Sequence, residues 1–356
     1  MNIHGLSEAL PANHTAYPGV TSSDITTEEW LTYWQKLRIR GLEPTSAQRV
    51  RYVVRLINAE LGSVPLQCLS YLHIQSCIDA MVEKSISLRT VRSAFLYFSE
   101  ALDIAKQRKL LGYNPCASMQ LPSISNPIRE VYSPDELIPL FEAAKGTELE
   151  NMIPVAMYAA LRAGEALALS WRQIDFQRKC ILIDQSYREY YNEENQKIKE
   201  IRQNTKSGRH RIIYPPECTF EYLAHQRLLQ EKRAHSSDQS GPIPDDLVFT
   251  TINGEMISFN RLRTAFSKLR QAAGLPNLRF HDLRHTGALI KYESTHDLWA
   301  VKDFLDHRFL GTTLRYIYHN RIDDNDLQKL EDFYSQFWDR TTDNNIDTYN
   351  YSDTVS

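Results

Sequence analysis

The C-terminal half of this 356-residue chain carries six basic or nucleophilic side chains in four short motifs that lie far apart in the sequence. The motifs occupy 160–167 (ALRAGEAL), 205–209 (TKSGR), 281–286 (HDLRHT) and 305–316 (LDHRFLGTTLRY). We interpret the six side chains as one active site, which requires a fold that brings all four motifs together. They are Arg162, Lys206, His281, Arg284, His307 and Tyr316.

This combination of side chains suits a phosphodiester. Two arginines can hold the non-bridging phosphate oxygens, because the guanidinium group is a rigid fork of donors. A lysine and two histidines can transfer protons or donate hydrogen bonds near neutral pH. A phenol has a pKa near 10 and needs neighbouring cations and a base to become a nucleophile. Such a set can cut and rejoin a DNA strand with no metal and no other cofactor.

In this chain order the residues resemble the tyrosine recombinases, also called phage integrases, over roughly residues 26–320. The family carries Arg, Lys, His-x-x-Arg, His or Trp, and then a nucleophilic Tyr. Here Tyr316 follows His307 by nine residues, which is a family spacing. Two positions depart from the family pattern, because Ala160 and Asp306 stand where the family has glycine.

The resemblance implies a role for each residue. Arg162 and Arg284 would bind the phosphate, and Glu165 would orient the site without reacting. His281 would transfer a proton, and His307 would hydrogen-bond a non-bridging oxygen in the pentacoordinate transition state.

The two remaining residues would make and break bonds. Lys206, in a turn of a long hairpin, would protonate the leaving 5′ oxygen, with Lys197 and Lys199 as alternatives. Tyr316 would form a 3′-phosphotyrosine, and Tyr318 is the alternative nucleophile. The phosphotyrosine would conserve the bond energy, so that rejoining needs no ATP.

A metal site is the rival interpretation of the third motif. His281 and His285 have an i, i+4 spacing that zinc can use. However, the motif lacks the Glu of H-E-x-x-H, and no obvious carboxylate ligand follows. We therefore expect no metal, and expect His285 to pack within its helix.

Hydrophobic periodicity predicts a mainly α fold with a small antiparallel β-sheet. The family resemblance implies that a helical core-binding domain is followed by an α/β catalytic domain. Thr26 with Glu29 predicts one helix start, and Ser133-Pro134-Asp135-Glu136 predicts another. Further helices are expected at 45–61, 71–84, 88–109, 135–145, 148–161, from Arg162 to about 169, and at 217–233, 259–273, 282–293, 297–305, 311–319 and 323–338. Strands are expected at 180–183 and 211–214, with turns at 192–195 and 206–208.

The expected domain boundaries follow from these elements. They are a lead-in at 1–25, a SAM-like core-binding domain at 26–116, a linker at 117–132, a catalytic domain at 133–322, and a C-terminal helix with an acidic tail at 323–356. The lead-in is too short for the arm-binding domain of bivalent integrases, so a two-domain type is expected.

Composition sets the cellular context. No stretch approaches the ~18 apolar residues of a membrane span, and no secretory signal is evident. The five cysteines are scattered, which predicts reduced thiols in a cytoplasmic protein. The net charge is −3, yet 323–356 holds nine acidic and two basic residues and so carries −7. Residues 1–322 are therefore basic, at +4, which is compatible with DNA binding.

The sequence thus predicts a site-specific recombinase that integrates or excises a mobile element, or resolves replicon multimers. The expected partners are double-stranded DNA recombination sites, further copies of the chain (a dimer on each site, a tetramer in the synapse) and an accessory directionality factor. A type IB topoisomerase is the nearest enzymatic alternative. A DNA-binding architectural protein that has lost activity, and a metal-dependent hydrolase, are the others.

Overall fold

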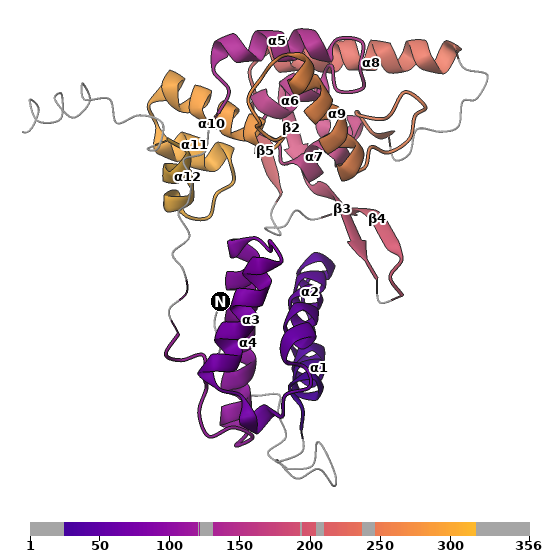
Figure 1. The fold of residues 1–356 in the computed structure, drawn as a ribbon. Helices are drawn as coiled ribbons and strands as arrows, with labels where there is room; N and C mark the ends of the chain where they lie inside the picture. Colours follow the sequence, from indigo (N-terminus) through magenta and orange to yellow (C-terminus); the bar gives the residue numbers. More distant parts are fainter. Residues whose placement is uncertain are drawn as a thin grey trace, which may run out of the picture. The chain divides into compact units, whose positions relative to one another are not determined.

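The computed structural model describes residues 25–119, 121, 131–192, 194–203, 210–236 and 246–317. By their contacts these residues form two units, which are treated separately (Figure 1). The first unit contains the described residues up to 121 together with Tyr190–Ile198, and the second contains the others. Most of the expected linker, the helix expected at 323–338 and the acidic tail lie outside the described residues. No helix in the described part is long and apolar enough to cross a membrane.

The first unit is built from the four predicted helices. These are α1 (Thr27–Arg38), α2 (Pro44–Leu61), α3 (Tyr71–Glu83) and α4 (Leu88–Gln107), with a short 3-10 helix, η2 (Leu66–Cys68), before α3. The predicted capping box at Thr26 is confirmed. Its hydroxyl accepts from the Glu29 N–H at 3.2 Å, and the Glu29 carboxylate accepts from the Thr26 N–H at 2.9 Å.

Apolar side chains from all four helices form the core of this unit. Trp30 of α1 is buried, and its indole N–H donates to the Ala101 carbonyl of α4 at 3.0 Å. Arg108, at the end of α4, donates to the Tyr33 hydroxyl at 2.8 Å and stacks on that ring. Arg89 and Arg92, at the start of the same helix, are exposed.

The second unit surrounds a small sheet with helices (Figure 1). Its helices are α5 (Pro134–Ala144), α6 (Met152–Tyr158), α7 (Ala163–Ala168), α8 (Cys218–Ser236), α9 (Phe259–Ala272), α10 (Asp282–Thr295), α11 (Leu298–Phe304) and α12 (Leu310–Ile317), with a 3-10 helix, η3 (Trp171–Gln173). It contains the strands β1 (Ile174–Asp175), β2 (Cys180–Ile183) and β5 (Arg211–Ile213). It also contains β3 (Gln185–Tyr191) and β4 (Lys197–Gln203), apart from Tyr190–Ile198, which belongs to the first unit. A mainly helical fold with small antiparallel sheets is therefore confirmed.

The central sheet is antiparallel with the order β1-β2-β5. Ile181 pairs with Ile213, and Ile183 pairs with Arg211. Ile181, Ile183 and Ile213 are buried in the core of the unit, which explains why the sequence indicated β2 and β5. In contrast, the β3–β4 ribbon joined by the predicted turn near Asn195 is exposed mainly along β4, and neither strand was predicted.

The helix predicted at 148–161 is wrong in length, because α6 spans only Met152–Tyr158. Pro154 has no N–H to donate, so it fits the first turn of a helix but not the middle of a longer one. At the other end, Ala160 adopts φ +46°, which is left-handed and ends the helix before Arg162.

Helix α10 lies directly against α6 through Gly287. A Cβ at this position would lie 2.1 Å from the Met157 carbonyl oxygen, so only glycine permits the approach. The contact fixes the position of α10 relative to the C-terminal end of α6. The motif at 281–286 is thereby held beside the motif that begins at Ala160.

We predict that Gly287→Ala lowers the free energy of unfolding by about 3 kcal/mol, because the new methyl group must push two packed helices apart. Urea unfolding of the full chain would measure it. Gly311→Ala is the matched control, because a Cβ there meets nothing within 4 Å. In a helix that substitution should be neutral or stabilising by up to ~1 kcal/mol. Equal effects of the two substitutions would contradict the packing argument.

Candidate functional site

Five of the six predicted site residues lie on described backbone of the second unit. Arg162 is the N-cap of α7, His281 is the N-cap of α10, and Arg284 lies in the first turn of α10. His307 lies between α11 and α12, and Tyr316 lies on α12. Lys206 lies outside the described residues, as does Tyr318.

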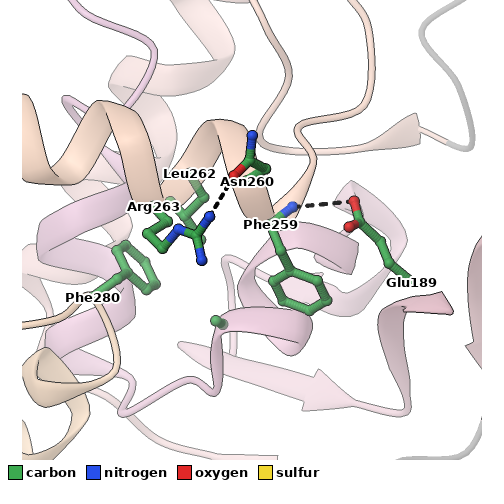
Figure 2. Close-up of a pocket in the computed structure, with 7 residues that line it drawn as sticks. Glu189, Phe259, Asn260, Leu262, Arg263 and Phe280 are labelled. Atoms are coloured by element: carbon green, nitrogen blue, oxygen red, sulfur yellow. Dashed lines mark hydrogen bonds between the residues drawn. The ribbon is translucent and has the colours of Figure 1, made fainter. Parts of the chain in front are cut away.

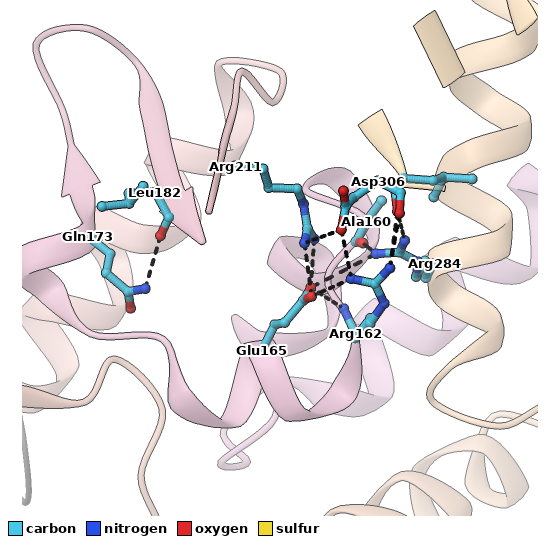
Figure 3. A network of polar contacts seen from close by, with 9 residues as sticks. Ala160, Arg162, Glu165, Gln173, Leu182, Arg211, Arg284 and Asp306 are labelled. Atoms are coloured by element: carbon cyan, nitrogen blue, oxygen red, sulfur yellow. Dashed lines mark hydrogen bonds and ion pairs between the residues drawn. The ribbon is translucent and has the colours of Figure 1, made fainter. Parts of the chain in front are cut away.

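A buried carboxylate, Glu165, organises the arginines of the site (Figure 3). Its Oε1 accepts from Arg162 Nη1 at 2.7 Å, and its Oε2 accepts from the Arg162 backbone N–H at 2.9 Å. Arg211 of β5 binds it with both terminal nitrogens, at 2.9 and 2.7 Å. The expectation that Glu165 orients the site is consistent with this geometry, whereas the contribution of Arg211 was not foreseen.

The pKa of Glu165 reports the strength of this arrangement. Burial alone would raise the pKa of the carboxyl group. The hydrogen bonds from Arg211, and the charges of Arg211, Arg162 and Arg284, outweigh burial and lower the pKa to about 2. Glu165 is therefore ionised at neutral pH and cannot serve as a proton donor.

Among the described arginines of the site Arg284 is the most buried, with 2% of its surface exposed. Its Nη1 donates to the Ala160 carbonyl and its Nη2 donates to the Leu305 carbonyl. The Leu305 carbonyl also lies 3.4 Å from Arg162 Nη2. One carbonyl between α11 and α12 thus lies within reach of both arginines that the sequence assigned to the phosphate.

Both departures from the family pattern fall on left-handed backbone. Ala160 has φ +46° and Asp306 has φ +50°, a region that glycine occupies without strain and most other residues avoid. The turns themselves are formed. The side chain of Asp306 lies beside the arginines, with Oδ2 at 3.7 Å from Arg162 Nη1 and 4.0 Å from Arg211 Nη1.

His307 is a neutral imidazole at pH 7. Burial is the largest cause that lowers its pKa, and the positive charges of Arg284 and Arg162 lower it further, to about 4. Its Nδ1 lies 3.0 Å from the Thr313 hydroxyl of α12. When that hydroxyl donates, the imidazole proton sits on Nε2, which can then donate to a ligand oxygen.

His281 and His285 stack edge to face, with ring centroids 4.8 Å apart. His285 is buried, as the sequence suggested, with Nε2 at 3.9 Å from Asp282 Oδ1. Among the described residues no group of three or more His, Cys, Asp or Glu side chains is arranged to hold a metal ion.

Arg211 is the functional candidate that the sequence missed. In the sequence it was only the first residue of the strand expected at 211–214, and no role was assigned to it. Its position at the start of a predicted strand could have indicated a buried role, because β5 pairs with β2 and lies next to the core. The Arg211 side chain is 9% exposed, in keeping with a supporting role for Glu165.

A separate hollow of about 380 Å³ lies between α7 and α9 (Figure 2). Phe259, Leu262 and Phe280 give it an apolar wall. The Glu189 carboxylate accepts from the Phe259 N–H at 3.3 Å. Its described lining contains none of the six predicted site residues.

The second unit corresponds to a known family. Residues 131–322 match the model of the phage integrase family. The chain belongs to this family, the tyrosine recombinases, and is a site-specific DNA recombinase by family. It is 26% identical over 274 residues to a XerC-like tyrosine recombinase of Caldanaerobacter subterraneus, covering 74% of this chain and 70% of that protein. It is 22% identical over 289 residues to the ICEBs1 integrase of Bacillus subtilis, covering 76% and 73%.

Solved structures show the same fold. The integrase of transposon Tn1549, in complex with a circular intermediate DNA, superposes with a TM-score of 0.71 at 17% identity, covering 87% of this chain and 99% of that one. A lambda integrase dimer bound to a COC′ core site gives a TM-score of 0.64 at 17% identity, covering 85% and 80%.

We predict that Ala160→Gly raises the free energy of unfolding of this recombinase by about 0.5–1 kcal/mol, because glycine relieves the left-handed strain. Thermal or urea unfolding would measure the gain. Ala159→Gly is the matched control: its residue is equally buried but has φ −92°, so the change should destabilise. A loss of stability in both variants would contradict the strain argument.

The lowered pKa of His307 predicts a pH dependence of stability. Between about pH 6.5 and pH 4 the unfolded chain binds a proton that the folded histidine refuses, so stability falls as the pH falls through this window. His307→Asn should remove about 1–2 kcal/mol of that fall, after allowance for partial exposure. Urea unfolding at pH 7.5 and pH 4.5 would show it. Parallel profiles for the two proteins would refute the shift.

Proposed function

We propose that this recombinase cuts and rejoins DNA through a 3′-phosphotyrosine at Tyr316, with Arg162, Lys206, His281, Arg284 and His307 as the other catalytic residues. One observation carries the proposal. Arg162, Arg284 and His307 converge on the turn that precedes α12, the helix that carries Tyr316. Helix α12 also contacts α10 and α11, which supports a site shared by the motifs at 281–286 and 305–316.

The arginines act on charge. The Arg162 side chain is 31% exposed and is accessible to a phosphate, whereas Arg284 is buried behind it. Arg162 would contribute N–H groups to non-bridging oxygens, and the positive charge of Arg284 would further stabilise the negative charge that develops in the transition state. Because Glu165 and backbone carbonyls already orient both forks, little side-chain entropy is lost when the phosphate arrives.

The remaining residues would form and break bonds, transfer protons or donate a hydrogen bond. The Tyr316 oxygen forms a bond to phosphorus and its proton passes to a base, for which His281 is the candidate. The bond to the 5′ oxygen breaks, and Lys206 supplies the proton to that leaving group. Neutral His307 donates a hydrogen bond to a non-bridging oxygen. Rejoining reverses the sequence, with a 5′ hydroxyl as the attacking group.

The biological reaction is integration or excision of a mobile element, or resolution of replicon multimers. The similar proteins include a transposon integrase and XerC-type recombinases, which favours this class over a type IB topoisomerase. Relaxation of supercoiled plasmids without a defined site would favour the topoisomerase. Site binding without any covalent adduct would favour an inactive architectural protein.

We also propose the partners and the domain limits. The lambda integrase has been solved as a dimer on a core site and as a tetramer on a Holliday junction, which supports the same stoichiometry here. An accessory directionality factor and a cytoplasmic location are further parts of the proposal. We assign core binding to 26–116, the linker to 117–132 and catalysis to 133–322.

Tyr316→Phe tests the nucleophile. The substitution removes only the phenolic oxygen, so folding and DNA binding should persist while covalent adducts fall to background. Sparsely nicked genomic DNA of the source organism would trap the adduct. Where a nick lies close to the cleaved phosphate, cleavage releases a short fragment, and the cut strand can no longer be rejoined. Mass spectrometry of the trapped protein would then locate the phosphotyrosine, and sequencing of the trapped DNA would give the site.

Tyr318→Phe is the matched control and should retain substantial adduct formation. Arg162→Lys and Arg284→Lys should depress cleavage far more than site binding, because a point charge cannot replace the bidentate fork. A phosphopeptide centred on Tyr318, or trapped DNA without phosphotyrosine, would refute the assignment.

A further inference from the structure

Asp306 places a carboxylate against Arg162, which is proposed to bind the phosphate, and against Arg211, which supports Glu165. Its Oδ2 lies 3.7 Å from Arg162 Nη1 and 4.0 Å from Arg211 Nη1 (Figure 3). The side chain is 17% exposed, so it is shielded from water on most sides. Its own backbone carbonyl also lies 3.5 Å from Arg162 Nη2.

The two carboxylates of the site differ in how they are held. Glu165 is 1% exposed and accepts hydrogen bonds of 2.7–2.9 Å from Arg162 and Arg211. Asp306 reaches the same two arginines only at ion-pair distance, beyond hydrogen-bonding range. Glu165 therefore belongs to the hydrogen-bonded framework of the site, whereas the contact of Asp306 with Arg162 is longer and weaker.

We propose that Asp306 is a counter-ion of the phosphate-binding Arg162, and that a DNA phosphate must displace it before cleavage. The inference rests on the proposed function of this site, because it concerns the same arginine. The displaced carboxylate loses its favourable contact with Arg162 and repels the incoming phosphate. Asp306 thus lowers the affinity of the site for any phosphate and restricts occupation to DNA that the rest of the protein also holds.

The experiment measures binding of a fluorescent random-sequence duplex to the full chain by anisotropy. Asp306→Asn keeps the shape of the side chain, tolerates left-handed φ and removes the charge. We expect it to bind about tenfold more tightly, from the Coulomb energy of charges ~4 Å apart reduced by solvent screening. Asp306→Gly should behave alike, which separates loss of charge from any new hydrogen bond of the Asn amide.

Two controls make the result specific. Asp303→Asn removes the same charge from an exposed residue of α11 whose partner is Lys302, and it should tighten binding much less. In a double-mutant cycle with Arg162→Gln, the gain from Asp306→Asn should largely disappear, because the two residues act on one contact. Equal gains at 303 and 306, or a full gain that persists without Arg162, would overturn the proposal.

These readouts do not depend on cleavage. If Tyr316→Phe retained covalent adducts, the proposed nucleophile would fail while the coupling between Asp306 and Arg162 could still be observed. If the coupling were absent while adducts mapped to Tyr316, the counter-ion proposal alone would fail.

Discussion

The ion pairs of Glu165 are the interaction on which the site depends. Arg162, Arg211 and Arg284 come from three separate segments and would repel one another in a buried setting if no anion lay between them. The Glu165 carboxylate binds two of them directly and lies 3.9 Å from the third. A buried charge is costly unless it is paired and hydrogen-bonded. The charged side chains of the cluster therefore stabilise one another only when all are present, and each arginine is oriented before any ligand binds.

Packing supplies the second condition. Helix α10 carries both His281 and Arg284, and its distance from α6 is set by the absence of a side chain at Gly287. The donation from Arg284 to the Ala160 carbonyl spans the same gap. A displaced α10 would break this bond and move Arg284 away from Glu165, so the helix contact and the charge cluster support each other.

Local signals in the sequence predicted much of the fold. The caps at Thr26 and Ser133 and the apolar faces of the helices gave the helix starts, because these depend on near neighbours in the chain. The β3–β4 ribbon was missed because strands such as Lys197–Gln203 are rich in charge and largely exposed. Likewise, the pairing of Arg211 with Glu165 joins residues 46 positions apart, and no local sequence pattern predicts it.

The residues that depart from the family pattern show how backbone and charge interact. A glycine at 306 would satisfy the left-handed turn and add no charge, leaving three arginines against one carboxylate. Asp306 keeps the turn, at some conformational cost, and brings the cluster of Arg162, Arg211, Arg284, Glu165 and Asp306 to a net charge of +1. A phosphodiester carries a single negative charge, so a phosphate that displaces the Asp306 carboxylate leaves the net charge of the site unchanged. The backbone strain at 306 is thus coupled to the net charge of the site. A sequence motif that is compared one position at a time reveals neither the strain nor the net charge.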